Sequence, residues 1–100
     1  SAATEKFQGF KLDSCAKEFC YQLQVPGTVE KGMLAPLYAF AKASLSVKQN
    51  SSGESNRFHC DDGYYDSVNQ EIVLRKVPEL QGGDILINLK TGEVKKFFNY

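Results

Sequence analysis

Residues 59–62, His-Cys-Asp-Asp, are the one run whose side chains could do chemistry, because they combine an imidazole, a thiol and two carboxylates. A thiol beside a histidine can act as a nucleophile with its base, and all three side-chain types bind metal ions. The sequence around Phe58 predicts a strand, however, and consecutive strand residues point to opposite faces, so His59 and Cys60 would not meet. The chain has no second histidine for a metal site. We therefore predict no catalytic residue, no metal and no cofactor here.

The two aspartates that follow Cys60 have a simpler interpretation as part of a turn. They precede Gly63, which can take the left-handed conformation that a tight hairpin needs. A small hydrolase is the alternative only if His59 faces a cleft beside a carboxylate. The chain has no P-loop, no dinucleotide-binding fingerprint and no serine elbow. We expect a protein that is not an enzyme.

The three cysteines form an odd set, and two of them are close in sequence. Four residues separate Cys15 from Cys20, a spacing that suits a disulfide across a tight turn between two strands and differs from the C-x-x-C of zinc ribbons. We predict this bridge, with a Cys20–Cys60 bridge or three buried thiols as the alternatives. A disulfide would indicate an oxidising compartment, either the periplasm or the cell exterior.

The apolar residues recur mainly with a period of two, which is the spacing of half-buried strands. This is clearest over residues 19–25, and the Pro-Gly pair that follows is expected to end that strand. Residues 37–48 carry apolar or small side chains at every odd position, which predicts a strand. An apolar stripe of helical spacing also runs through this part of the chain, so a short helix near 33–40 is the alternative there.

Short turns separate the remaining strands. Three segments have turn or loop composition: residues 50–56, 67–70 and 90–92. The last of these ends in glycine and joins residues 84–89 to 93–98, which is a strong hairpin signal. We therefore predict a single domain over residues 1–100 that is mainly β, built from short antiparallel hairpins as a jelly roll or as a partly open barrel or sandwich.

Charge and hydropathy exclude two classes of partner. The chain has 12 basic and 12 acidic residues, and no basic stripe of the kind that nucleic acids require is visible. No segment approaches the ~20 apolar residues of a transmembrane helix. We expect a soluble domain that does not bind nucleic acid.

Two segments resemble the repeat of the lipopolysaccharide-transport β-jellyroll family, also called OstA-like. Residues 64–74 have a Tyr-Asp pair, a short polar turn and alternating apolar residues that end in leucine. Residues 83–94 look like the continuation, with a Gly-Asp start, an apolar strand and a hairpin tip containing Thr-Gly. Residues 43–48 resemble the preceding strand, so the resemblance covers about residues 43–98.

The resemblance implies a periplasmic jelly roll that binds lipopolysaccharide or lipid acyl chains on its inner apolar face and passes them along an envelope transport assembly. It also implies stacking on other β-jellyroll proteins by edge strands and a possible membrane-anchored partner. The candidate lining residues share the inward face of their strands. They are Leu45, Val47, Phe58, Ile72, Leu74, Ile85, Ile87, Leu89 and Val94.

A second function fits the same sequence. Small, neutral, cysteine-bridged domains without an active site also serve as secreted or periplasmic inhibitors or immunity-type proteins, which block another protein with a loop or an edge strand. The shape of the interior separates the two hypotheses. An open apolar groove would favour lipid binding, whereas a sealed core with a protruding loop, such as residues 49–57, would favour the inhibitor.

Overall fold

The structure is a computed structural model, and it describes residues 3–100. This part of the chain forms one antiparallel sheet with a single short 3-10 turn, as predicted for a mainly β domain. The elements are β1 (Thr4–Ala16), β2 (Phe19–Gly32), β3 (Leu37–Phe40), β4 (Ala43–Gln49), β5 (Ser55–Cys60), β6 (Asp62–Asp66), β7 (Glu71–Val77), η1 (Pro78–Leu80), β8 (Gly83–Asn88) and β9 (Val94–Phe97).

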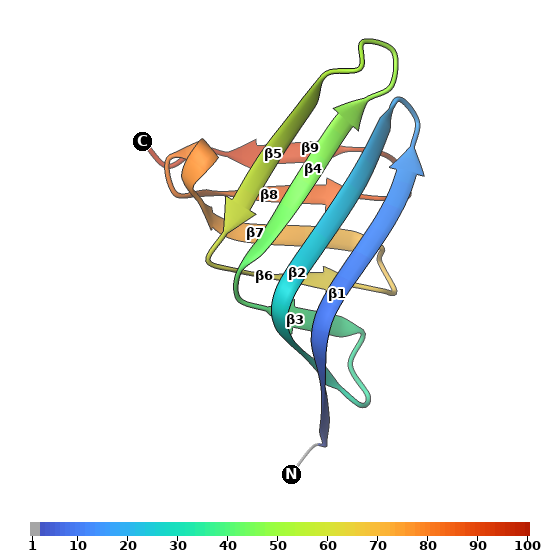
Figure 1. The fold of residues 1–100 in the computed structure, drawn as a ribbon, viewed down its shortest axis with the longest axis vertical. Helices are drawn as coiled ribbons and strands as arrows, with labels where there is room; N and C mark the ends of the chain where they lie inside the picture. The colour runs from blue at the N-terminus through green and yellow to red at the C-terminus, as the bar shows by residue number, and fades with distance from the viewer. Residues whose placement is uncertain (1–2) are drawn as a thin grey trace.

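The sheet curls into a half-barrel. Its strand order is β5-β4-β2-β3-β6-β7-β8-β9, and β1 pairs with the other side of β2. In Figure 1, β1, β2, β4 and β5 form a front layer, and β3 with β6 to β9 crosses behind them at a steep angle. The apolar face of each layer therefore points toward the other layer, and the core lies between them.

The long strand β2 joins the two layers because it changes partner along its length. It pairs with β4 up to Gln24 and with β3 from Val29. The strand was predicted to end at Pro26 and Gly27, but it continues through them. Proline has no N–H to donate. Pro26 lies between the part of β2 that pairs with β4 and the part that pairs with β3, so no strand needs a donor from it on that side. On the other side these two residues oppose the single residue Gly9, which has a φ of 83°.

The helix considered near residues 33–40 is absent. Residues 33–36 form a turn, and β3 follows directly. Met33 and Leu34 are exposed, so the stripe that fits a helix has no core to pack against. The strand predicted over residues 37–48 is divided into β3 and β4. β4 shows the predicted alternation, with Ala43, Leu45 and Val47 buried.

Gly63 does not form the hairpin turn that was predicted. It is buried inside β6, at the point where the chain crosses from β5 in one layer to β6 in the other. A Cβ on Gly63 would collide with the carbonyl oxygen of Val73 and lie 3.0 Å from the ring of Phe40. The glycine is therefore required by close packing of the backbone and not by an unusual φ angle.

The two hairpins toward the C-terminus are confirmed. β6 and β7 pair across residues 67–70, and β8 and β9 pair across a turn in which Gly92 has a φ of 78°. The side chain of Asn88 accepts hydrogen bonds from the backbone N–H groups of Lys90 and Thr91, which holds this turn. Leu80 of η1 is buried and closes the end of the core beside β8.

Candidate functional site

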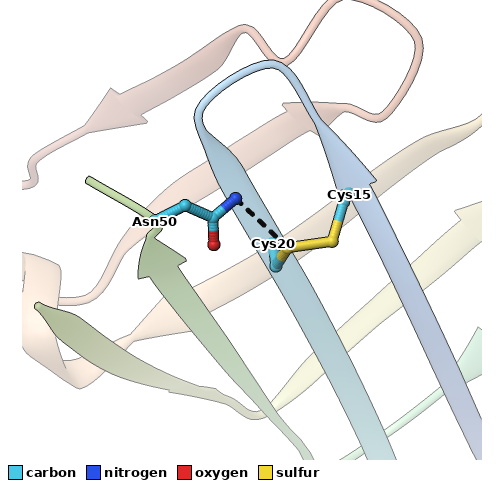
Figure 2. Close-up of a disulfide and its surroundings, with 3 residues drawn as sticks. All are labelled: Cys15, Cys20 and Asn50. Carbon is cyan, nitrogen blue, oxygen red and sulfur yellow. Dashed lines mark hydrogen bonds between the residues drawn. A yellow bond between two sulfur atoms is a disulfide. The ribbon is translucent and has the colours of Figure 1, made fainter. Parts of the chain in front are cut away.

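The predicted disulfide is present. Cys15 and Cys20 are paired residues of β1 and β2, and a bond joins their sulfur atoms. Figure 2 shows the bridge below the turn of this hairpin, with the side-chain amide of Asn50 directed at the sulfur of Cys20 at 3.5 Å. The bridge therefore fixes the end of the β1–β2 hairpin next to the loop between β4 and β5. Cys60 is free and buried.

The prediction that His59 and Cys60 face opposite ways is confirmed. Cys60 is buried in the core, while His59 is exposed on the outer face of β5. Burial raises the pKa of the Cys60 thiol to about 11, so it is protonated at neutral pH. A protonated thiol on the other side of the strand cannot serve the imidazole as a nucleophile.

His59 does have a carboxylate neighbour, which sequence reasoning did not identify. Its ring Nδ1 lies 2.7 Å from Oε2 of Glu79, and its backbone N–H donates to Oε1 at 2.9 Å. Partial burial alone would raise the pKa of Glu79, but the hydrogen bonds from His59 outweigh it and hold that pKa below its ordinary value. The pair lies on the surface and lines none of the hollows described below. It ties the free edge of β5 to η1.

No metal centre is evident in residues 3–100, since no three His, Cys, Asp or Glu side chains gather there. The Asp61 and Asp62 carboxylates also do not converge with His59: the imidazole pairs with Glu79 instead. The arrangement can hold these two segments of the chain together.

Six of the nine candidate lining residues are closed core. Eight of the nine, all except Val94, are less than a tenth exposed and lie in one continuous cluster between the two layers. Six of these eight line neither of the two hollows described below: Leu45, Ile72, Leu74, Ile85, Ile87 and Leu89. The inner face of the half-barrel is thus filled by its own side chains over most of its length. The expectation of inward-facing apolar residues was right, and these six leave little exposed surface on which a ligand could lie.

The other three candidates, Val47, Phe58 and Val94, come together at an open groove. The groove has a volume of about 490 Å³ and lies where the end of β2, β4 and β5 approach the edge strand β9. Its apolar wall is completed by Phe19, and Lys96 stands at its rim. The Nζ atom of Lys96 is 5.4 Å from the centre of the Phe58 ring. In the described part of the chain, no carboxylate lies within ion-pair distance of this lysine.

Sequence reasoning missed Phe19 and Lys96, although both left a signal. Phe19 begins the alternating run of β2 with the same parity as the buried Tyr21. Lys96 has the same parity as Val94 on β9 and pairs with the buried Ile85. A lysine at an inward position of an edge strand either protects the edge from pairing or faces something charged.

A second hollow, of about 520 Å³, lies on the outer side of the bend in β2. It includes Pro26 and Phe10, but Lys11, Gln24 and Ser44 form much of its wall. These polar side chains interrupt the apolar surface. The groove beside β9 also has two polar side chains, Asn56 and Lys96, but it presents four apolar side chains where this hollow presents three. It also contains the three predicted lining residues that reach a hollow, so we take it as the candidate site for an apolar ligand.

Aromatic side chains also gather where β1 lies over β3 and β6. We call Phe7, Phe10, Tyr38 and Tyr65 the aromatic strip. The ring of Tyr38 is the centre of the strip, with ring centroids 5.4 Å from Phe10, 5.9 Å from Tyr65 and 6.3 Å from Phe7. Phe7 is 37% exposed at the edge of the sheet. The strip thus continues the core out to the edge formed by β1.

The disulfide is typical of proteins in an oxidising compartment outside the cytosol. No helix within residues 3–100 has the length and apolar character needed to span a bilayer. Comparison with family models, with curated proteins and with solved structures gives no match for this chain.

Proposed function

We propose that this protein is a non-catalytic binding domain of an extracytoplasmic compartment, and that it holds the acyl chain of a lipid in the groove beside β9. The observation that carries the proposal is the wall of Phe19, Val47, Phe58 and Val94 around an open volume of about 490 Å³. Pockets for small ligands are concave, mainly apolar and roughly 300–1,000 Å³ in volume. The groove fits that description.

The rim of the groove supports a ligand with an anionic end. Lys96 is free of carboxylate partners among the described residues and lies over the Phe58 ring. A lysine in this position can lay its aliphatic stem on the apolar wall and direct its ammonium group to the mouth. An acyl chain in the groove would then place a carboxylate or phosphate headgroup within reach of Lys96.

The resemblance to the lipopolysaccharide-transport family points in the same direction. Every groove residue except Phe19 belongs to the segment that carries the resemblance, residues 43–98. A periplasmic protein that carries the acyl chains of lipopolysaccharide within an envelope assembly is therefore the specific form of this proposal. The groove has a volume of about 490 Å³, so this domain would hold part of such a ligand and not enclose all of it.

A lipid-binding assay with matched variants tests the proposal. Val94→Asp puts a charge on the groove wall at a partly exposed edge-strand position, while Val68→Asp puts the same charge in the exposed β6–β7 turn. We expect Val94→Asp to reduce binding of a fluorescent fatty acid by at least roughly tenfold and Val68→Asp to leave it unchanged, because an unpaired carboxylate disfavours an apolar ligand. Equal binding by both variants would contradict the proposal.

The headgroup contact has its own arm in the same assay. Lys96→Glu should weaken binding of an anionic fatty acid and leave binding of the matching fatty alcohol unchanged. Lipid A analogues compared with plain fatty acids then test the lipopolysaccharide form. If the protein binds fatty acids but shows no preference for the lipid A analogue, the groove remains the proposed lipid site and the lipopolysaccharide form of the proposal is rejected.

The inhibitor hypothesis is the second candidate because one loop is both exposed and ordered. The loop between β4 and β5 extends past the end of the sheet in Figure 1, and its residues 50–54 are exposed. Backbone hydrogen bonds between Gln49 and both Gly53 and Glu54, and from Asn50 to Glu18, hold its shape. A preorganised loop loses little entropy on binding a partner. If the wild-type protein binds none of the lipids, the inhibitor hypothesis is favoured over lipid binding.

A further inference from the structure

β1 is an open sheet edge that the proposed function does not use. It is 13 residues long, it pairs with β2 only, and it lies at the outer edge of the front layer in Figure 1. Within residues 3–100 no other strand pairs with its second side. A long open edge presents a row of backbone donors and acceptors that another strand can use.

The disulfide shows which residues of β1 present their backbone groups to that edge. The Cα atoms of Cys15 and Cys20 are 4.0 Å apart, a distance typical of a pair that exchanges no backbone hydrogen bonds, whereas hydrogen-bonded pairs are about 5.5 Å apart. The N–H and C=O of Cys15 therefore point away from β2. Asp13 and Lys11 lie on the same face of the strand, so their backbone groups point to the open edge as well.

The same row continues on the other side of Gly9. Gln8 and Lys6 lie on the outer face, where their side chains contact those of Thr28 and Glu30. The side-chain face and the direction of the backbone groups are coupled in a strand. Lys6, Gln8, Lys11 and Asp13 are therefore the residues whose N–H and C=O groups are free to pair at this edge.

We propose that β1 pairs with β1 of a second copy of this chain, antiparallel, about a two-fold axis between Gly9 and Phe10. In this register Lys6 lies opposite Asp13 of the second copy, and symmetry repeats the pair. Gln8 lies opposite Lys11 of the second copy. All four positions present their backbone groups to the open edge, so they form about eight inter-strand hydrogen bonds, two for each pair.

The apolar side chains match in the same register. Phe7 lies opposite Leu12 of the second copy, and both are on the inner face of β1, where their β2 partners Val29 and Leu23 are buried. These two positions would form a pair without backbone hydrogen bonds, in which side chains approach most closely. Leu12 of the second copy would thus cover Phe7 and extend the aromatic strip across the interface.

Neighbouring registers are less favourable. Moving the second strand by two residues in one direction sets Lys6 opposite Lys11, which places like charges face to face. Moving it by two residues in the other direction sets Asp13 opposite Gln8 and removes the ion pair. A shift by one residue puts inner-face side chains opposite outer-face ones. The charge pairs and the matching of inner-face with inner-face side chains together select one register. In that register the edge of β1 is complementary to itself, as a two-fold dimer requires.

Sedimentation equilibrium of the oxidised full-length protein tests the proposal by charge exchange. We expect a reversible dimer for the wild type. Lys6→Asp alone or Asp13→Lys alone creates two like-charge pairs and should weaken the dimer roughly tenfold or more, and the double variant should restore affinity to within about threefold of wild type. Lys11→Glu is the matched control, because its partner Gln8 is neutral and the dimer should persist.

A backbone variant makes the test independent of charge. The N–H of Lys11 points to the open edge, so Lys11→Pro removes a donor from the interface while leaving the β1–β2 pairing intact. It should give a monomer whose melting temperature, extrapolated to low concentration, is close to that of the wild type.

Three outcomes would overturn the proposal. If the wild-type protein stays monomeric up to millimolar concentration, β1 does not pair with a second copy, and a strand of a different protein becomes the better candidate for this edge. A dimer that neither single exchange weakens would use another surface. Failure of the double variant to recover, with all variants folded by circular dichroism, would exclude this register.

Discussion

The carboxylate of Glu79 receives two hydrogen bonds from one residue, His59: one from its backbone N–H at 2.9 Å and one that involves ring Nδ1 at 2.7 Å. This contact joins the free edge of β5 to the turn that follows β7. His59 is the only histidine of the chain, and in this contact it links two segments of the fold. The contact closes one side of the half-barrel.

Glu79→Gln should therefore destabilise the protein in a pH-dependent way. The pKa of Glu79 is lowered in the folded state, so the contribution of its charge is present above the unfolded-state pKa of about 4.5 and is lost as the pH falls through the folded-state pKa. At pH 7 the variant should be less stable by about 0.5 kcal/mol, a small value because the pair is solvent-exposed. Urea unfolding at pH 7 and pH 3 measures both differences. A stability difference between wild type and Glu79→Gln that is larger at pH 3 than at pH 7 would contradict this account.

Loss of the disulfide should destabilise the protein more than Glu79→Gln does. Cys15→Ser with Cys20→Ser removes a cross-link that closes a short loop in the unfolded chain, and the expected destabilisation is about 2 kcal/mol in the chain-entropy description. Urea unfolding of the variant and of wild type with and without reductant measures it. Reduced wild type should match the variant. Cys60→Ser is the control that separates the effect of the bridge from that of the free thiol.

The free thiol of Cys60 should not react in the native protein. Burial raises its pKa to about 11, and it donates to the carbonyl oxygen of Ala41 at 3.4 Å. The thiolate is the reactive form, and at pH 8 very little of it is present. Intact-mass analysis after iodoacetamide treatment should show no label under native conditions and one label in urea. Rapid native labelling would mean that β5 opens readily.

Local features of the fold were predictable from the sequence, and crossings between layers were not. The turn containing Gly92 and the bridge at Cys15 depend on residues close together in the chain, and both predictions are confirmed. The continuation of β2 through Pro26 depends on β4 and β3 pairing with different parts of that strand. No local pattern contains this information. Gly63 was misassigned for the same reason, because its packing partner Val73 comes from another strand.

The candidate site was predictable only as a set of inward-facing residues. Period-two alternation assigns Ile87 and Val94 equally to the inner face. Their surroundings differ because β8 has strands on both sides, whereas β9 is an edge strand with a groove beside it. Which inward residues stay open depends on where the sheet ends, and strand order is set by long-range pairing that the alternation does not encode.

The contrast between Ile87 and Val94 gives the last prediction. Ile87 has no exposed surface, so Ile87→Phe has no space for the added atoms and should lower the free energy of unfolding by about 1–3 kcal/mol. Val94→Phe adds a comparable volume at the groove, where open space is available, and should change stability by less than about 0.5 kcal/mol. Urea unfolding of both variants at pH 7 measures the difference.

The same variants probe function, because the larger side chain introduced by Val94→Phe would occupy the groove and should reduce fatty-acid binding without unfolding the protein. A stable Ile87→Phe variant would show that the core between β7 and β8 is looser than its burial indicates, and a Val94→Phe variant that binds lipid normally would place the ligand elsewhere.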